Sequence, residues 1–243
     1  MKTRFHLRAS DHLGTSDGKR FFNEKHFAES APRYDLATRV LSFGRDSCWK
    51  RSLIEGLPDL SKPVCVDVAC GTGDVTFLLA EKYPDGECIG SDLTQEMIDI
   101  ASERSADPAV RFICGDMGEL PLEDASVDIL TGSYAIRNAP DLDVALAEFR
   151  RVVKPGGTVA FLDFSKAKGH FGQAIQSGML GFWGGLWGLI LHGNPEVHGY
   201  IAKSLRTFPN PSALEQAFVG AGFAIEGDRS FLGGMMNLYF LKA

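Results

Sequence analysis

The sequence has few cysteines and histidines, and none of them is spaced as a metal site or a disulfide framework requires. Its five cysteines (positions 48, 65, 70, 88 and 114) form no C-x-x-C pair and are odd in number. Its six histidines are scattered, without H-x-x-x-H or H-E-x-x-H spacing. We therefore expect no metal site, and we interpret the cysteines as small apolar residues of a protein in a reducing compartment.

Positive charge and long apolar runs are also scarce. The 25 Lys and Arg residues are outnumbered by 31 Asp and Glu, so the net charge is -6 and nucleic acid is not an expected partner. No run reaches the ~20 apolar residues of a membrane-spanning helix. The N-terminal MKTRFHLRASDHLG lacks the apolar core of a signal peptide. No G-x-S-x-G elbow is present, which argues against a hydrolase. Together these absences favour an enzyme of the cytoplasm.

The most informative stretch is residues 64–74, VCVDVACGTGD. Three β-branched valines alternate with Cys65 and Asp67, as in a strand that is buried on both faces. Gly71 and Gly73 then allow a tight turn that brings backbone N–H groups close to a ligand. Apolar residues at helical spacing follow from Val75 onward. The stretch predicts a strand, a glycine turn and a helix, an arrangement typical of nucleotide sites.

The glycine turn departs from the two common phosphate-binding motifs. A dinucleotide fingerprint needs a third glycine where this chain has Thr76, and a P-loop needs a Lys that is absent after either glycine. The remaining interpretation is a turn suited to a nucleoside without a pyrophosphate, as in methyltransferases that use S-adenosylmethionine. The alternative is an ordinary strand–helix turn, because many α/β proteins place glycine there.

The rest of the chain repeats the strand–helix unit and then changes pattern. Alternating strands and helices predict a parallel, doubly wound sheet with right-handed crossovers, which binds ligands at the carboxyl ends of its strands. A helix over residues 211–222 followed by two strands predicts an antiparallel hairpin at the sheet edge. We expect strands at residues 64–68, 87–92, 109–114, 127–133, 158–164, 224–231 and 236–241.

Regions outside this repeat carry separate expectations. Residues 1–20 are polar and are expected to be poorly ordered, while residues 21–243 form one domain with a helical cap at 21–60. Residues 166–205 are expected to form a helical lid or substrate region. Within it, GMLGFWGGLWGLILHG is either a helix pair over a sheet edge or an apolar patch that receives an apolar tail or touches a bilayer. Its glycines argue against a rigid buried helix.

Acidic residues at the predicted strand ends suit an adenosyl ligand. Asp92 ends the second strand about 20 residues past the glycine turn, where a carboxylate can accept both ribose hydroxyl protons. Asp116 ends the third strand and can accept from an adenine amino group, with the Met117 N–H facing the ring. A turn role is the alternative for both aspartates. Asp67 is expected to organise the glycine turn by accepting N–H bonds, and Thr72 and Ser133 offer hydroxyls at the mouth.

Four stretches resemble the C-methyltransferases of ubiquinone and menaquinone biosynthesis, the UbiE family. The glycine turn and Lys-Pro-Gly-Gly are shared by many methyltransferases, whereas Arg137-Asn138 with the Tyr34-Asp35 and Trp49 segment is much more specific. The stretches are RYDLATRVLSFGRDSCWKR (33–51), DVACGTGD (67–74), SYAIRNAPDLDVALAEFRRVVKPGG (133–157) and SLRTFPNPSALEQAFVGAGF (204–223).

The resemblance implies a seven-stranded class I methyltransferase fold and S-adenosylmethionine as cofactor. It implies that Tyr34, Arg137 and Asn138 face a quinol, for which an apolar tail is expected. The sequence leaves peripheral membrane contact and a homodimer open. With the residues argued above, the expected cofactor-binding set is Asp67, Gly71, Thr72, Gly73, Asp92, Leu93, Asp116, Met117 and Ser133.

Methylation of a ring carbon needs an electron-rich ring, so the acceptor is expected in its reduced, dihydroxy form. Arg137 could stabilise the phenolate that forms or orient a water that takes the proton, because a neutral Arg is not available as a base. Asn138 and Tyr34 would hold the water or hydroxyl by hydrogen bonds. The alternative for Arg137 is a surface ion pair, for instance with Asp141.

The region after residue 165 departs from the family pattern. His198 stands where the family often has the first Tyr of a Tyr-x-Tyr pair, with Tyr200 as the second.

Three functions therefore compete. The first is C-methylation of a prenylated quinol, the second is methylation of another aromatic or natural-product acceptor, and the third is a cofactor-binding scaffold without catalysis. A nicotinamide dehydrogenase is disfavoured by Thr76.

Overall fold

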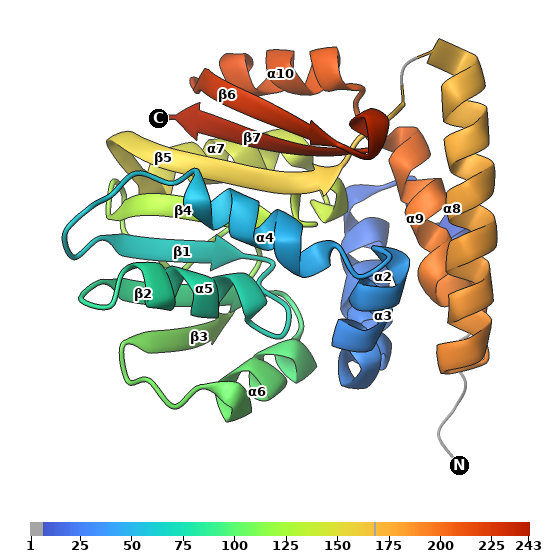
Figure 1. Cartoon of the computed structure of the whole chain (residues 1–243), viewed down its shortest axis with the longest axis horizontal. Coiled ribbons are helices and arrows are strands. Elements are labelled where there is room, and N and C mark those ends of the chain that lie inside the picture. Colours follow the sequence, from blue (N-terminus) through green and yellow to red (C-terminus); the bar gives the residue numbers. More distant parts are fainter. Residues whose placement is uncertain (1–6, 168) are drawn as a thin grey trace.

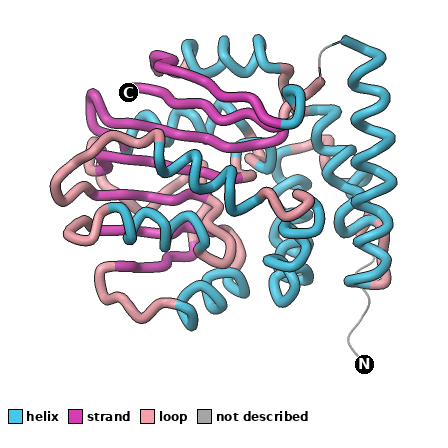
Figure 2. Tube along the Cα trace, in the orientation of Figure 1, coloured by secondary structure: helices cyan, strands magenta, loops and turns pink. Residues whose placement is uncertain are grey.

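The computed structural model describes residues 7–167 and 169–243, which form a seven-stranded sheet with helices on both faces (Figures 1 and 2). The sheet order is β3-β2-β1-β4-β5-β7-β6, with five parallel strands followed by an antiparallel pair. The expected class I methyltransferase architecture is confirmed. The strands are β1 (Val64–Val68), β2 (Glu87–Asp92), β3 (Val110–Cys114), β4 (Val127–Ser133), β5 (Val153–Phe164), β6 (Ala224–Phe231) and β7 (Met236–Lys242).

The central strand β1 is buried on both faces, as its β-branched sequence predicts. Val66 and Val68 pack with helices α7 (Leu142–Val152) and α10 (Pro211–Gly220) on one face. Cys65 packs with α4 (Asp46–Glu55) and α5 (Asp74–Lys82) on the other. The remaining crossover helix, α6 (Gln95–Arg104), packs against β2 and β3. The parallel strands thereby present their carboxyl ends at one end of the sheet.

The strand β5 is longer than predicted, because it begins at Val153 and includes the Lys-Pro-Gly-Gly turn signal. Its pairing with β4 shifts register between Val127 and Ile129, which accommodates the extra residues. The predicted start of the strand at residue 158 therefore marks the register shift between β4 and β5, and not the start of β5.

The N-terminal segment differs from the prediction of poor order. Within the described part of residues 1–20, α1 (Ala9–His12) and the start of α2 (Ser16–Ser30) are helical; residues 1–6 lie outside the described residues. Thr15 caps α2 by accepting a hydrogen bond from Gly18 N at 3.1 Å. Ala9 and Phe22 are fully buried against a later helix. A few apolar anchors therefore order a segment whose composition is mostly polar.

Helices α2, α3 (Tyr34–Leu41), α8 (Gly169–His192) and α9 (Glu196–Thr207) form a cap beyond the carboxyl ends of the parallel strands (Figure 1). In the described part of the expected lid region, α8 and α9 are thus a helix pair, but they cover strand ends and not a sheet edge. The cap places side chains from both ends of the chain opposite the glycine turn.

The glycines of α8 do not break the helix, which is largely exposed and is not the buried helix that the sequence argued against. A Cβ on Gly184 would lie 2.6 Å from His198 O, and one on Gly188 would lie 2.6 Å from Asn194 O. The glycines therefore let α8 pack against α9 at a distance that side chains would prevent.

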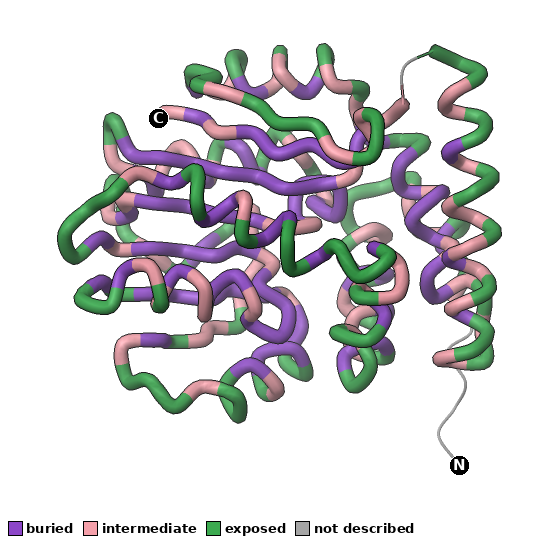
Figure 3. Tube along the Cα trace, in the orientation of Figure 1, coloured by how far each residue is buried: buried purple, intermediate pink, exposed green. Residues whose placement is uncertain are grey.

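By length and composition alone, α8 is long and apolar enough to cross a membrane, although the sequence predicted no such run. Only 22% of its apolar window is buried, and exposed residues recur along it (Figure 3). The helix is therefore a covering element of the cap with a largely free outer face.

Candidate active site

Two cavities meet at the carboxyl ends of the strands. The strand-end cavity, about 580 Å³, lies among β1, β2, β3, β4 and helix α2, and its lining includes Gly71, Asp92 and Asp116. The cap cavity, about 870 Å³, lies among α2, α3, α8 and α9 and is lined mostly by apolar side chains. The two cavities share the residues Phe27, Tyr34, Tyr134 and Asn138.

The glycine turn places backbone at the wall of the strand-end cavity. Gly71 has a φ of +55°, and a Cβ there would meet the Tyr34 ring at 3.4 Å. Gly73 has a φ of +92°, and its Cβ would lie 2.9 Å from the rings of Phe112 and Phe77. Both positive φ values favour glycine, and at Gly73 the two rings also leave no room for a Cβ. The turn leaves Gly71 in the cavity wall, where its backbone can approach a ligand closely.

Asp92 is held rigidly at the same wall. Its two carboxylate oxygens accept backbone hydrogen bonds from Gly71 N and Thr94 N, each at 2.9 Å. Burial raises the pKa of Asp92, while these two hydrogen bonds act in the opposite direction. The carboxylate is therefore fixed beside the turn, where its remaining lone pairs can accept from ligand hydroxyls.

Four other predicted cofactor residues line the strand-end cavity: Leu93, Asp116, Met117 and Ser133. Asp116 also accepts a hydrogen bond from Gly118 N at 2.8 Å and pairs with Arg20 Nε at 3.3 Å. Asp116 therefore stabilises its own turn through Gly118 and also lines the cavity.

The structure places three predicted cofactor residues away from the lining of this cavity. Asp67 accepts hydrogen bonds from the hydroxyls of Thr76 and Thr131, each at 2.9 Å, and not from the N–H groups of the turn. Its burial raises its pKa to about 7. Thr72 donates to Asp35 Oδ1 at 2.6 Å and thereby ties the turn to α3. Gly73 packs on aromatic rings, so all three support the turn from behind.

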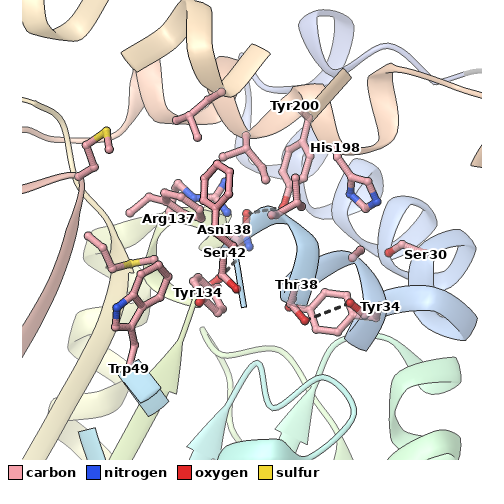
Figure 4. Close-up of a pocket in the computed structure, with 18 of the residues that line it drawn as sticks. Ser30, Tyr34, Thr38, Ser42, Trp49, Tyr134, Arg137, Asn138, His198 and Tyr200 are labelled. Carbon is pink, nitrogen blue, oxygen red and sulfur yellow. Dashed lines mark hydrogen bonds between the residues drawn. The ribbon is translucent and has the colours of Figure 1, made fainter. Parts of the chain in front are cut away.

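Arg137 lines the cap cavity and is only 2% exposed (Figure 4). Its Nε lies 3.5 Å from Asp163 Oδ1, and its backbone N donates to Asp163 Oδ2 at 3.0 Å. One guanidinium nitrogen donates to the hydroxyl of Ser204, and the Tyr200 ring centre is 5.4 Å from the guanidinium carbon. Burial alone would lower the pKa of Arg137, but Tyr200 and Asp163 raise it above its ordinary value. Arg137 is therefore a buried cation, and the surface pair with Asp141 is wrong.

Asn138 and Tyr34 lie where the two cavities meet (Figure 4). The Asn138 amide donates to Tyr134 O at 2.8 Å, and its oxygen accepts from the Tyr200 hydroxyl at 3.4 Å. Burial raises the pKa of Tyr34 well above its ordinary value, so its phenol stays protonated. The predicted trio is brought together by elements more than 90 residues apart in the chain.

Sequence reasoning missed Tyr134, which forms part of the wall common to both cavities. Its hydroxyl donates to Asp46 Oδ1 at 2.6 Å, and its φ is +58°, an uncommon value for a non-glycine residue. Asp46 in turn pairs with Lys50 Nζ at 2.7 Å, which also reaches Asp74 Oδ2 at 3.1 Å. The position of Tyr134, directly after the end of β4 and three residues before the Arg-Asn pair, is the signal that could have identified it.

Two histidines of the cap cavity were also missed. His26 and His198 both line it, and both are buried. Figure 4 shows His198 at the cavity wall. Within the described part of the chain, His198 Nε2 is buried and has no hydrogen-bond partner. Burial, followed by the charge of His192, lowers the pKa of His198 to about 4. His198 is therefore a neutral, buried group with one nitrogen available to a ligand; its replacement of an expected Tyr was the available signal.

The ubiE/COQ5 methyltransferase family model matches residues 16–241. The chain belongs to this family. Membership means that the chain is a methyltransferase with S-adenosylmethionine as methyl donor. The strand-end cavity fits that cofactor, because a glycine turn, a fixed carboxylate and a second acidic strand end lie in one wall.

Curated relatives of this ubiE/COQ5 methyltransferase cover most of the chain. A demethylmenaquinone methyltransferase of Thermus thermophilus is 36% identical over 205 residues, covering 82% of this chain and 91% of the relative. One from Deinococcus radiodurans is 38% identical over 205 residues, covering 82% and 84%. One from Staphylococcus aureus is 31% identical over 215 residues, covering 88% and 89%.

Solved structures share the fold at lower identity. A chain in the complex of the Haloferax volcanii Trm112 methyltransferase activator with its methyltransferase partner aligns with a TM-score of 0.67 and 17% identity, covering 89% of this chain and 97% of that one. The geranyl diphosphate C-methyltransferase of Streptomyces coelicolor aligns with a TM-score of 0.63 and 13% identity, covering 81% and 76%. At these identities the likeness supports the fold alone.

Proposed function

We propose that the chain methylates a ring carbon of a prenylated quinol, a precursor of menaquinone or ubiquinone. The names of the curated relatives support this acceptor. The observation that carries the proposal is the pair of adjoining cavities, one with polar strand-end groups and one largely apolar, with Tyr34 and Asn138 in both walls. A methyl donor in the first cavity and an aromatic ring in the second would meet at that shared wall.

In this proposal, S-adenosylmethionine supplies an electrophilic methyl group. Loss of a hydroxyl proton from the acceptor makes the neighbouring ring carbon nucleophilic. That carbon forms a new carbon–carbon bond to the methyl group as the sulfur–methyl bond breaks. The same ring carbon then loses its own proton, which restores the aromatic ring. The buried charge of Arg137 stabilises the phenolate, because a permanent cation in a site of low polarity strongly favours a nearby anion. Arg137 is charged, so it does not take the proton itself.

Asn138 and Tyr34 have positioning roles in the proposal. Asn138 is fixed by bonds to Tyr134 and Tyr200, so its side chain can hold the ring at one orientation. Alignment of the ring carbon and the methyl group at about 3–3.5 Å supplies a large share of the rate enhancement. The proposed cofactor contacts are Gly71, Asp92, Leu93, Asp116, Met117 and Ser133, all of which line the strand-end cavity.

The proposal includes a location. We place the protein in the cytoplasm, in peripheral contact with the inner face of the membrane, because a prenylated quinol partitions into lipid. A homodimer, which the sequence left open, is tested by the sedimentation measurement described below.

A transfer assay tests the function. Purified protein is given methyl-labelled S-adenosylmethionine and a short-tailed demethylated quinone, with and without reductant, and label is counted in the organic extract. We expect label only with reductant, and a loss of roughly a hundredfold in kcat for Arg137→Gln. Cofactor binding without label on any quinol would contradict the proposed acceptor.

A further inference from the structure

The outer face of α8 carries a continuous row of exposed apolar side chains. They recur at intervals of three or four residues, so they share one helix face. No Lys, Arg, Asp or Glu occurs between residues 169 and 192. We name this row the α8 stripe; it consists of Phe171, Ile175, Met179, Phe182, Leu186 and Leu189.

The cap cavity reaches the surface at the α8 stripe. Met179 belongs to the stripe and also lines the cavity. Phe43 and Leu232 line the cavity and are exposed as well. Phe43 stacks on Trp183 of α8, with ring centres 5.1 Å apart and an interplanar angle of 17°. The mouth of the cavity is therefore apolar and continuous with the stripe.

Basic side chains lie beside α8. Arg33 donates a hydrogen bond to Leu191 O near its C-terminal end. Arg206 donates to the Ser177 hydroxyl, with Nη2 at 3.1 Å, and Lys166 Nζ reaches Arg206 O at 2.9 Å. An uncharged apolar face flanked by cations complements a lipid surface with anionic head groups.

We propose that this face docks on an anionic bilayer, with α8 parallel to the membrane plane and the stripe among the outer acyl chains. The inference rests on the proposed function, since the mouth at Phe43, Met179 and Leu232 would take the quinol tail directly from lipid. The helix does not span the bilayer in this arrangement, because its other face packs at Gly184 against α9 and at Gly188 against the turn that precedes α9.

Vesicle binding tests the docking surface. Phe171→Ser/Phe182→Ser changes two stripe residues that are 81% and 73% exposed, so the fold does not depend on them. Val219→Ser/Leu60→Ser is the matched control, because Val219 and Leu60 are exposed apolar residues outside the cap. Each full-length protein is sedimented with vesicles of equal parts phosphatidylglycerol and phosphatidylcholine. We expect the stripe variant to bind about tenfold more weakly than wild type and the control to bind as wild type does.

Turnover separates failure of the docking from failure of the proposed function. With a tail-less acceptor in solution, both variants should match wild type; with a long-tailed quinol in vesicles, only the stripe variant should slow. If wild type methylates neither quinol, the proposed function fails and vesicle binding still decides the docking. The docking is wrong if wild type does not bind vesicles, or if the stripe variant binds as well as wild type.

A second copy of the chain is the competing occupant of this face. Sedimentation velocity of wild type and the stripe variant without lipid measures that outcome. A wild-type dimer that the two serines dissociate, together with no binding to vesicles, would assign the face to self-association and overturn the proposal.

Discussion

At the scale of single residues, Arg137 carries both stability and the proposed chemistry. Its guanidinium and the Asp163 carboxylate are both almost fully buried, and each is the nearest opposite charge of the other among the ion pairs described. Removal of one member of such a pair leaves a buried charge without compensation. An activity loss in a single variant would therefore not distinguish misfolding from lost catalysis.

A paired substitution separates the two effects. Arg137→Gln alone should lower the free energy of unfolding by roughly 3–5 kcal/mol, because Asp163 stays buried and loses the cation that compensates its charge. Adding Asp163→Asn should restore most of that stability in urea unfolding, while methyl transfer stays roughly a hundredfold below wild type. A double variant with wild-type turnover would refute the role of the Arg137 charge.

His198 offers a second test at this scale. Its Nε2 is buried in the cap cavity without a partner among the described residues, so a substrate hydroxyl can bond to it. We expect His198→Phe to raise the KM for the quinol about 5–10-fold, the equivalent of one hydrogen bond, with kcat and S-adenosylhomocysteine affinity unchanged. His198→Gln, which keeps a donor and an acceptor, should change the KM less.

The protonation state of His198 gives a further check on that test. Because its pKa is lowered to about 4 from an ordinary value of 6.5, the ring is neutral from about pH 5 upward. The KM effect should therefore be constant over this range, as steady-state kinetics at several pH values would show. An effect that titrates near the ordinary pKa of histidine would contradict the neutral, buried assignment.

At the scale of elements, the packing of α8 on α9 depends on glycines. Gly184→Ala would place a methyl group 2.6 Å from His198 O, so the helices must move apart, which lowers stability by about 1–3 kcal/mol. Gly178→Ala is the matched control on the same helix, because nothing lies within 4 Å of its Cβ position. That control should be neutral or stabilising by up to about 1 kcal/mol. Thermal unfolding of both variants measures the difference, and equal midpoints would contradict the packing argument.

The sequence predicted the sheet well because its strands are punctuated by local signals. Strand β4 was predicted with its observed bounds, and the antiparallel hairpin at residues 224–241 was expected from the order helix, strand, strand. Helix α1 and the first residues of α2 were not predicted, because Ala9 is ordered by contacts with α9, more than 180 residues later. Local composition cannot report such a contact. The rest of α2 falls in the expected helical cap at 21–60.

The candidate site was predictable where it depends on strand ends. Gly71 and Asp92 follow neighbouring parallel strands, so their meeting at one edge follows from topology. Asp67 and Thr72 were expected at the cofactor but bond to other side chains, because a strand pattern does not say which partner a side chain will face. Asn23 and His26 lie on α2, whose docking over the site is set by tertiary contacts alone.

At the scale of the whole molecule, one buried group links stability to pH. The folded-state pKa of Asp67 is raised to about 7 from its ordinary value of 3.8, mainly by burial. Between these values the folded protein binds more protons than the unfolded chain, so the contribution of Asp67 to stability is lost as pH rises. It is fully present below about pH 4 and absent above about pH 7.

Asp67→Asn isolates this contribution, because the pH dependence of every other group cancels in the difference. The free energy of unfolding of wild type relative to the variant should fall by a few kcal/mol between about pH 4 and pH 7 and then level off. Urea unfolding at a series of pH values measures it. A difference that is constant, or that rises with pH, would show that Asp67 is ionised throughout.

The architecture as a whole places a cofactor site and an apolar acceptor site against one shared wall, and it presents the acceptor site to the surface along α8. The central claim is that a methyl group crosses that wall to a ring carbon of a reduced quinol. The most direct measurement is carbon-13 NMR of the product formed from ¹³C-methyl-labelled S-adenosylmethionine and reduced short-tailed demethylmenaquinone. We expect a single labelled methyl on a ring carbon, absent when the quinone is left oxidised. Label on an oxygen, or equal transfer to the oxidised quinone, would show that the acceptor is not a ring carbon of the reduced quinol.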